Sequence, residues 1–286
     1  MEKLKRIAAI HDLSCLGKCS LTVALPVISA SGVECACIPT AVLSTHTGEF
    51  DGFTFKDMSG ELLPIAEHWK RENIEFDGIY SGYLASAEQE MMLEKVIDTI
   101  KSDKTKIIVD PVMADNGRYY ADRGNEMCIA FRRLCKRADI ITPNVTEAAF
   151  LTDTEYCSTV HDESYIDRLM QGLSKYCRGI IAITGVRPTE NTVGVAVLNV
   201  SSGENHLMTR PAAPGVFHGA GDLFASAFSA LLTRGASLED ACGISLALVR
   251  DSIDRTVKRG SPRKHGIDFE GAIPNYVNQI CDLFGE

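Results

Sequence analysis

The sequence HGAGD at residues 218–222 leads directly into the apolar run LFASAFSALL at residues 223–232. Small residues before a helix leave its first backbone N–H groups accessible, and the helix dipole adds about half a positive charge, so this end attracts an anion. The carboxylate of Asp222 at the same end repels a resting anion and is better suited to take a proton. Backbone amides that can bind a phosphate, together with a carboxylate that can take a proton, are suited to the transfer of a phosphoryl group to an alcohol. The alternative is a glycine turn before a buried helix, with Asp222 as its N-cap.

Short β-branched runs alternate with longer amphipathic segments along the rest of the chain. Several short runs are continuously apolar, as expected for strands covered on both faces. The sequence therefore predicts an α/β fold with a mostly parallel central sheet and helices on both faces. The predicted strands are Arg6–Ile10, Glu34–Pro39, Gly78–Tyr80, Lys106–Val109, Asp139–Ile141 and Gly179–Thr184. The predicted helices are Ser20–Ser31, Asp57–Asn73, Ala87–Lys101, Gly124–Lys136, Glu147–Leu151 and Glu163–Cys177.

A hairpin is predicted at one edge of this sheet. The segments Thr192–Val200 and Asn205–Arg210 flank the turn sequence SSGE and would add antiparallel strands. The chain beyond the hairpin has a helical pattern. No repeat, low-complexity tract or linker interrupts the sequence, so we expect residues 1–286 to form a single domain.

Polar side chains follow the predicted strands at the points where these strands end. Because ligands bind outside the carboxyl ends of strands in a parallel sheet, we expect these side chains to share one site. The set consists of Asp12, Asp110, Asn144, Glu147, Thr184 and Gly185, with Asp222 at the start of the helix that follows the hairpin.

Composition and charge exclude several classes of function. The 286 residues are 45% hydrophobic, which is ordinary for a globular protein, and carry a net charge of −9 at pH 7. An acidic chain is a poor general partner for nucleic acid or an anionic membrane, so neither partner is expected. No apolar run approaches the roughly 18 residues that span a bilayer, and the one at residues 7–10 is too short for a signal peptide. We expect a cytoplasmic protein.

The ten cysteines do not form a recognisable metal-binding pattern. The close pairs are Cys15 with Cys19 and Cys35 with Cys37, and neither has the CxxC spacing of a structural zinc site. We therefore expect buried, reduced thiols.

Three segments together resemble the ribokinase superfamily of small-molecule kinases. They are DPVM at residues 110–113, TPNVTEA at 142–148 and GAGD at 219–222, and their order and spacing match over nearly the whole chain. Two further segments, STHTG at residues 44–48 and SGYLASAEQ at 81–89, resemble pyridoxal kinases in particular. The resemblance implies a ribokinase-like fold and ATP-dependent phosphorylation of the 5′-hydroxymethyl group of a B6 vitamer (pyridoxal, pyridoxamine or pyridoxine).

The resemblance also implies roles in the transfer step. Asp222 would take the proton from the substrate alcohol as it attacks the γ-phosphate of ATP. The backbone amides of Gly219, Ala220 and Gly221 would hold the charge that develops on the transferred group.

A second implied group of residues serves the metal. Asn144 and Glu147 would organise Mg²⁺ through waters, because Mg²⁺ retains much of its hydration shell, and Asp110 would help to place the metal and the phosphates. The alternative for Glu147 is a solvated charge in the first turn of a helix. A monovalent cation such as K⁺ is also compatible with the resemblance.

The remaining implied ATP contacts come from a strand end and a loop. The residues expected at the nucleotide are Thr184, Gly185 and Phe217, with core packing as the alternative for Phe217. The sequence DNGRYY at residues 115–120 would form a lid over ATP, with Asp115 and Tyr120 near the phosphates. An ordinary surface loop is the alternative for this segment.

Three residues are the candidates for the vitamer ring. Asp12 lies where many pyridoxal kinases have serine, and a carboxylate there would bind the phenolic hydroxyl or a protonated pyridine nitrogen and favour a cationic amine. Tyr83 would stack on the ring, a contact worth about 1 kcal/mol. Thr47 is the third candidate. A local turn hydrogen bond for Thr47 and a core position for Tyr83 are the alternatives.

Two other functions compete with a B6 kinase. Hydroxymethylpyrimidine kinase is favoured by the segment at 142–148, but the stretch LSCLGK at residues 13–18 lacks the Gly-Gly-Ala-Gly typical of that family. A catalytically silent protein that binds a vitamin or nucleotide is the second alternative, against which Asp222, Asn144 and Glu147 count. The resemblance also implies a homodimer.

Overall fold

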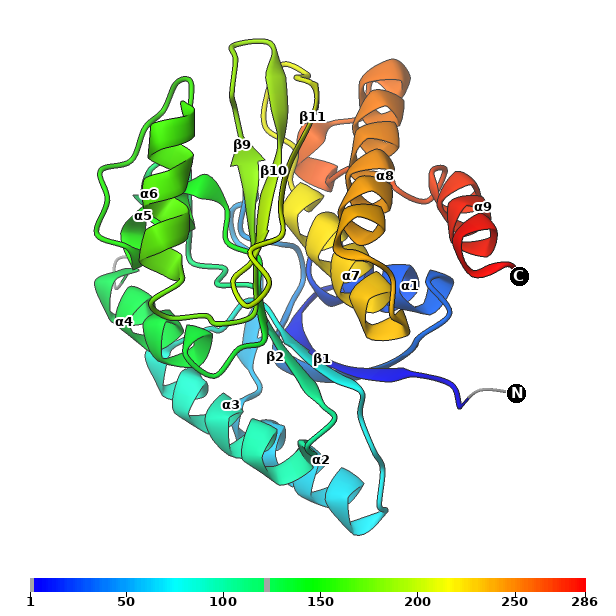
Figure 1. Ribbon diagram of the computed structural model, residues 1–286. Helices are drawn as coiled ribbons and strands as arrows, with labels where there is room; N and C mark the ends of the chain where they lie inside the picture. Colours follow the sequence, from blue (N-terminus) through cyan, green and yellow to red (C-terminus); the bar gives the residue numbers. More distant parts are fainter. Residues whose placement is uncertain (1–2, 121–123) are drawn as a thin grey trace.

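The computed structural model describes residues 3–120 and 124–286 of the chain (Figure 1). A nine-stranded sheet forms its centre, in the order β11-β10-β9-β8-β5-β4-β1-β2-β3. The strands from β9 to β2 in this order pair in parallel, whereas β10, β11 and β3 pair antiparallel at the two edges. The strands are β1 (Arg6–Ser14), β2 (Glu34–Leu43), β3 (Phe55–Asp57), β4 (Gly78–Ser81), β5 (Lys106–Val109), β8 (Ile140–Ile141), β9 (Ile180–Val186), β10 (Thr192–Asn199) and β11 (Asn205–Pro211). The predicted α/β fold and its edge hairpin are confirmed.

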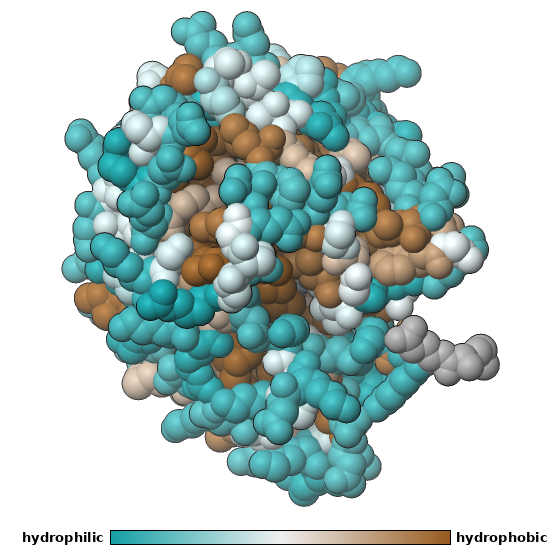
Figure 2. All heavy atoms as spheres, viewed as in Figure 1, coloured by the Kyte–Doolittle hydropathy of each residue, from teal (hydrophilic) through white to brown (hydrophobic). Residues whose placement is uncertain are grey.

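Helices cover both faces of this sheet (Figure 1). Because side chains alternate along a strand, Ile7 and Ala9 enter the core on one face and Ala8 and Ile10 enter the core on the other. The first face carries α1 (Leu21–Ala30), α7 (Ala220–Arg234), α8 (Leu238–Arg259) and α9 (Ile273–Phe284). The second carries α2 (Ser59–Arg71), α3 (Ala87–Ile100), α4 (Gly124–Cys135), α5 (Val145–Leu151) and α6 (Glu163–Leu173). Most of the surface in Figure 2 is hydrophilic, with apolar residues set back between polar ones.

Several predicted boundaries differ from the structure. Strand β1 continues to Ser14, beyond the predicted end at Ile10, because its pairing with β2 resumes after an irregularity between His11 and Leu13. The polar residues that suggested a strand end are therefore buried inside the strand. Residue Asp57, predicted to open a helix, belongs instead to β3, which pairs with the end of β2, and α2 starts at Ser59.

The cysteines are all free, but only some are buried as predicted. Cys128, Cys135, Cys177 and Cys242 are buried, five others are half-buried, and Cys15 is exposed. Within residues 3–120 and 124–286, no group of three or more His, Cys, Asp or Glu side chains is placed to hold a metal. In the same residues, no helix has both the length and the apolar character needed to cross a membrane.

Candidate active site

Two cavities meet at the carboxyl edge of the parallel strands. The first has a volume of about 350 Å³ and the second about 520 Å³. The residues that line both are Val112, Tyr120, Gly219 and Asp222. Asp222 therefore lies at the junction, where a group bound in one cavity can reach a group bound in the other.

The first cavity collects most of the predicted site residues. Those that line it are Asp110, Asp115, Tyr120, Asn144, Glu147, Thr184, Gly185, Phe217, Gly219, Ala220, Gly221 and Asp222. Phe217 lines the cavity and also packs against the core on the α7 face, so a position at the nucleotide site and core packing are both compatible with the structure. The second cavity contains the remaining predicted residues, Asp12, Thr47 and Tyr83. The fold thus brings together residues that lie more than 200 positions apart.

The start of α7 is shaped by Gly219. This residue is the N-cap, with a left-handed φ of 82°, and a Cβ there would lie 2.0 Å from the carbonyl oxygen of Lys18, so only glycine fits. The alternative interpretation of Asp222 as N-cap is wrong, because Asp222 is the third residue of the helix. The N–H of Ala220 is bonded to the Phe217 carbonyl at 3.3 Å. Among the described residues the N–H of Gly221 has no protein acceptor, and this residue faces open space.

Both carboxylate oxygens of Asp222 are held by groups from the opposite end of the chain. Oδ2 accepts a hydrogen bond from the backbone N–H of Ser20 at 3.0 Å. Oδ1 lies 3.1 Å from Nε2 of His11. These contacts join α7 to β1 and to the start of α1, and they fix the orientation of the carboxylate.

His11 is the main site residue that the sequence reasoning missed. Its ring is 1% exposed and lies between two carboxylates, with Nδ1 3.0 Å from Asp12 Oδ1 and Nε2 at Asp222. Burial alone lowers the pKa of His11, but hydrogen bonds to Asp12 and Asp222 outweigh it and raise the pKa to about 10. The raised pKa favours a protonated ring; Nδ1 also lies within hydrogen-bond distance of the backbone N–H groups of Asp12, at 3.0 Å, and Tyr83, at 3.2 Å. A histidine directly before Asp12 in a buried strand was the available signal.

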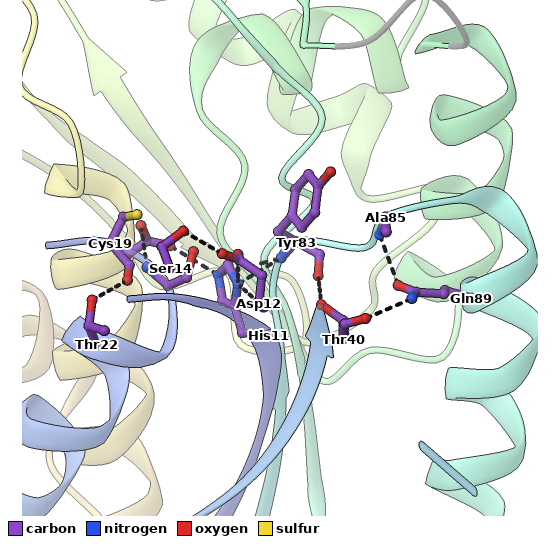
Figure 3. Close-up of polar contacts among 11 residues, drawn as sticks. His11, Asp12, Ser14, Cys19, Thr22, Thr40, Tyr83, Ala85 and Gln89 are labelled. Atoms are coloured by element: carbon purple, nitrogen blue, oxygen red, sulfur yellow. Dashed lines mark hydrogen bonds and ion pairs between the residues drawn. The ribbon is translucent and has the colours of Figure 1, made fainter. Parts of the chain in front are cut away.

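Polar contacts extend from His11 and Asp12 to the segment that carries Tyr83, whose backbone N–H lies 3.2 Å from Nδ1 of His11 (Figure 3). Asp12 Oδ2 accepts a hydrogen bond from Ser14 at 2.8 Å, and Thr40 donates to the Tyr83 carbonyl at 3.0 Å. Gln89 donates to the Thr40 carbonyl at 2.9 Å and accepts from the backbone of the Tyr83 segment. The Tyr83 ring points away from this network and lines the second cavity, so it is not a core aromatic residue.

Burial opposes ionisation of Asp12, yet the hydrogen bond from His11 holds the pKa of this carboxyl below its usual value. Asp12 is therefore ionised at neutral pH and already paired with His11. Its charge is partly compensated before any ligand binds. A cationic ligand would consequently meet less negative charge here than the sequence alone suggests.

Asp110 and Glu147 form a pair of buried acids in the first cavity. Burial, reinforced by the negative charge of Asp222, raises the pKa of Asp110 to about 8. Burial and then Asp110 raise the pKa of Glu147 well above its usual value. In the part of the chain that the structure describes, neither acid forms an ion pair with Lys or Arg. Ionising both acids therefore costs free energy, and a bound cation would offset that cost.

Glu147 also anchors the surrounding backbone. Its Oε2 accepts from the N–H of Asn144 at 2.8 Å, while Asn144 Oδ1 accepts from the N–H of Glu147 at 2.9 Å, which is a reciprocal capping box. Its Oε1 accepts from the N–H of Met113 at 3.1 Å. Glu147 is 2% exposed, so the alternative of a solvated charge is wrong. The three-residue spacing of Asn144 and Glu147 was a signal for this box.

The segment at residues 115–120 belongs to a small hairpin rather than an irregular loop. Strands β6 (Ala114–Asp115) and β7 (Arg118–Tyr119) pair antiparallel across a turn in which both central residues, 116 and 117, have positive φ. Asp115 accepts hydrogen bonds from Asn116, so this carboxylate stabilises the turn. Tyr120 follows the hairpin and lines both cavities.

Thr47 reaches the second cavity from the loop between β2 and β3. Its neighbour His46 lies 2.6 Å from the Lys264 carbonyl through Nε2 and accepts from the N–H of Gly48 through Nδ1. Glu49 belongs to the same loop, and its carboxylate lies 3.1 Å from Nε2 of His218, a residue that lines the first cavity. The loop therefore lines the second cavity and contacts His218, which lines the first.

The chain is similar in sequence and in fold to known kinases of small molecules. The family model described as phosphomethylpyrimidine kinase matches residues 24–267. A solved structure from Bacteroides thetaiotaomicron, assigned as a phosphomethylpyrimidine kinase and crystallised with pyridoxal, is 34% identical, with 96% of each chain covered and a TM-score of 0.90. The pyridoxal kinase of Lactobacillus plantarum is 27% identical, with 98% of this chain and 99% of that chain covered and a TM-score of 0.86. A Schizosaccharomyces pombe protein assigned as a pyridoxal kinase is 26% identical over 295 residues, covering 98% of this chain and 93% of its own.

Proposed function

Because the chain belongs to the phosphomethylpyrimidine kinase family, as a kinase of the pyridoxal kinase type, we propose that it phosphorylates the 5′-hydroxymethyl group of a B6 vitamer with ATP. The observation that carries this proposal is the junction of two cavities at Asp222 and Gly219. Phosphoryl transfer needs a donor site and an acceptor site that meet at one base. The first cavity would hold ATP and the second would hold the vitamer.

Asp222 is the base in this proposal. It takes the proton of the acceptor alcohol while the alcohol oxygen attacks the γ-phosphorus and the bond to ADP breaks. The N–H of Gly221, a residue that lines the first cavity and for whose N–H the described residues provide no acceptor, and the α7 dipole stabilise the negative charge on the transferred group. Gly219 keeps the backbone of this turn in the conformation that the α7 start requires.

The buried acids fit a divalent cation. Asp110 would contribute a carboxylate to Mg²⁺, while Asn144 and Glu147, whose polar atoms are hydrogen-bonded to backbone, would act through water or by positioning the surrounding chain. Mg²⁺ commonly binds through one or two carboxylates plus phosphates and waters, so a full cage of protein ligands is not required. When bound, Mg²⁺ neutralises charge on the β- and γ-phosphates.

The second cavity supports a ring-shaped acceptor. Tyr83 offers an aromatic face, Thr47 a hydroxyl, and Asp12 a carboxylate held by His11. The B. thetaiotaomicron neighbour was crystallised with pyridoxal, which supports a B6 vitamer as the acceptor. The 115–120 hairpin and Tyr120 would close over the phosphates and exclude water. The whole chain would then act as one kinase domain; a homodimer, a cytoplasmic location and a K⁺ requirement stay predictions.

Hydroxymethylpyrimidine is the second candidate acceptor. The matched family model and the B. thetaiotaomicron neighbour both carry the phosphomethylpyrimidine kinase description. This molecule also presents a primary alcohol on an aromatic nitrogen ring. The two acceptors must therefore be compared directly in the same assay.

The test is release of ADP from ATP and Mg²⁺ with pyridoxal, pyridoxamine, pyridoxine or hydroxymethylpyrimidine as acceptor. We expect turnover of at least one B6 vitamer, and a decrease in kcat of about 10²-fold or more in Asp222→Asn. The matched control is Asp240→Asn, because Asp240 is also the third residue of a helix, α8, but its side chain is exposed. Turnover of hydroxymethylpyrimidine alone would transfer the proposal to that acceptor. No acceptor-dependent turnover would reject both.

A further inference from the structure

We infer that His11 is a positioning residue that holds the base Asp222 and connects it to Asp12 in the acceptor cavity, an inference that rests on the proposed kinase function. The observation is the continuous bridge from Asp12 through both nitrogens of the His11 ring to Asp222. The two carboxylates belong to β1 and α7, which lie 210 residues apart in the sequence. His11 lines the second cavity, but its ring is 1% exposed and both ring nitrogens are occupied by carboxylates, so we assign it a role through Asp222 rather than on the substrate.

Two neighbours pack against the His11 ring. Gly82 packs directly against it, and a Cβ at this residue would lie 2.0 Å from both Cδ2 and Nε2 of the ring. Tyr80 lies edge-on to the ring at a centroid distance of 6.3 Å. These neighbours restrict the ring, and its Nε2 holds one of the two carboxylate oxygens of Asp222.

The His11 ring lies among several acids. The titratable groups that face this region from the surrounding elements are Asp12 on β1, Asp222 on α7, Asp110 after β5, Tyr80 on β4, Tyr83 after β4 and Cys19 before α1. Three of these are carboxyl groups. Without the ring, Asp222 would lose the group that holds its Oδ1, and the carboxylate could turn away from the proton of the acceptor alcohol.

The bridge also connects acceptor binding to the base. A ligand in the second cavity that contacts Asp12 changes the charge seen by Nδ1 of His11, and the opposite nitrogen contacts Asp222. The same carboxylate that would contact the vitamer therefore influences the orientation of the base. Removing the Asp12 charge is expected to affect kcat and the acceptor KM together.

The experiment compares His11→Gln with wild type in the ADP-release assay from pH 5.5 to 9. Glutamine retains an N–H donor but carries no charge. We expect kcat to fall by about 10²-fold while the KM for ATP changes by less than about threefold, because glutamine cannot bridge Asp12 and Asp222 as the ring does. His206→Gln is the matched control, since His206 also contacts a carboxylate, Glu204, but lies on the outer hairpin.

Two additional measurements keep the inference testable if His11→Gln folds poorly. Nitrogen-15 NMR of wild type at pH 8 is expected to show His11 as an imidazolium, and Asp12→Asn is expected to lower kcat in the same direction as His11→Gln. Wild-type turnover with an unchanged kcat and pH profile in His11→Gln, or a neutral His11 at pH 8, would overturn the inference and leave the proposed function intact. No wild-type turnover with any acceptor would overturn both.

Discussion

The most quantitative prediction concerns the stability of the protein without ligand and the buried carboxyl of Asp110. Burial and the charge of Asp222 raise its pKa from 3.8 to about 8. Between these two values the folded state binds a proton that the unfolded state has released, so folding stability falls as pH rises. One proton corresponds to about 1.4 kcal/mol per pH unit, which gives on the order of 4 kcal/mol between pH 5 and pH 8.

Asp110→Asn removes this titration. We expect its free energy of unfolding to fall less steeply with pH than that of wild type, and the variant to be the more stable protein at pH 8. The assay is urea unfolding at several pH values, without Mg²⁺ or nucleotide. Asp167→Asn, which changes an exposed carboxylate on α6, is the control for the change in net charge. If wild type and Asp110→Asn had the same slope from pH 5 to pH 8, the assignment of a raised pKa to Asp110 would be refuted.

Three further predictions concern the site and its support. Gly82→Ala should displace the His11 ring. We expect the variant to lose about 1–3 kcal/mol of stability in urea unfolding and to have a lower kcat, as His11→Gln does. A kcat equal to that of wild type would contradict this prediction. Mg²⁺ affinity, measured by calorimetry, should decrease by up to about tenfold for each pH unit below pH 8, because the metal must displace the proton of Asp110. An affinity that does not depend on pH would count against Asp110 as a ligand. Gln89→Leu should raise the KM for the acceptor more than the KM for ATP, because it removes the hydrogen bonds that Gln89 forms with the Thr40 carbonyl and the Ala85 N–H beside Tyr83. Equal effects on the two KM values would contradict a role of Gln89 in supporting the acceptor cavity.

The sequence was sufficient for the parts of the fold that depend on local periodicity. Continuous apolar runs such as 107–109 and 180–183 identify strands buried on both faces, and the rule that ligands bind at the carboxyl ends of strands correctly grouped Asp110, Asn144 and Thr184 around one cavity. These inferences succeed because burial on both faces and strand direction leave a direct trace in the sequence.

Other features depend on partners that are distant in the chain. His11 interrupts an apolar run and therefore suggested the end of β1, yet the strand continues because Asp12 and Asp222 satisfy the buried ring. Likewise, β3 forms because its backbone pairs with β2, although its three residues, FKD, are all exposed and show no buried apolar pattern. Neither the acid that neutralises a buried histidine nor the strand that pairs with a short edge can be identified from local pattern alone.

The most direct test of the account is detection of the phosphorylated product itself. Wild type, Asp222→Asn and Asp240→Asn are incubated with ATP, Mg²⁺ and each B6 vitamer, and the vitamer 5′-phosphate is measured by mass spectrometry. The account predicts product with wild type and Asp240→Asn and at least about 10²-fold slower formation with Asp222→Asn. Vitamer phosphate formed equally fast by Asp222→Asn, or none formed by wild type, would contradict transfer at the junction of the two cavities.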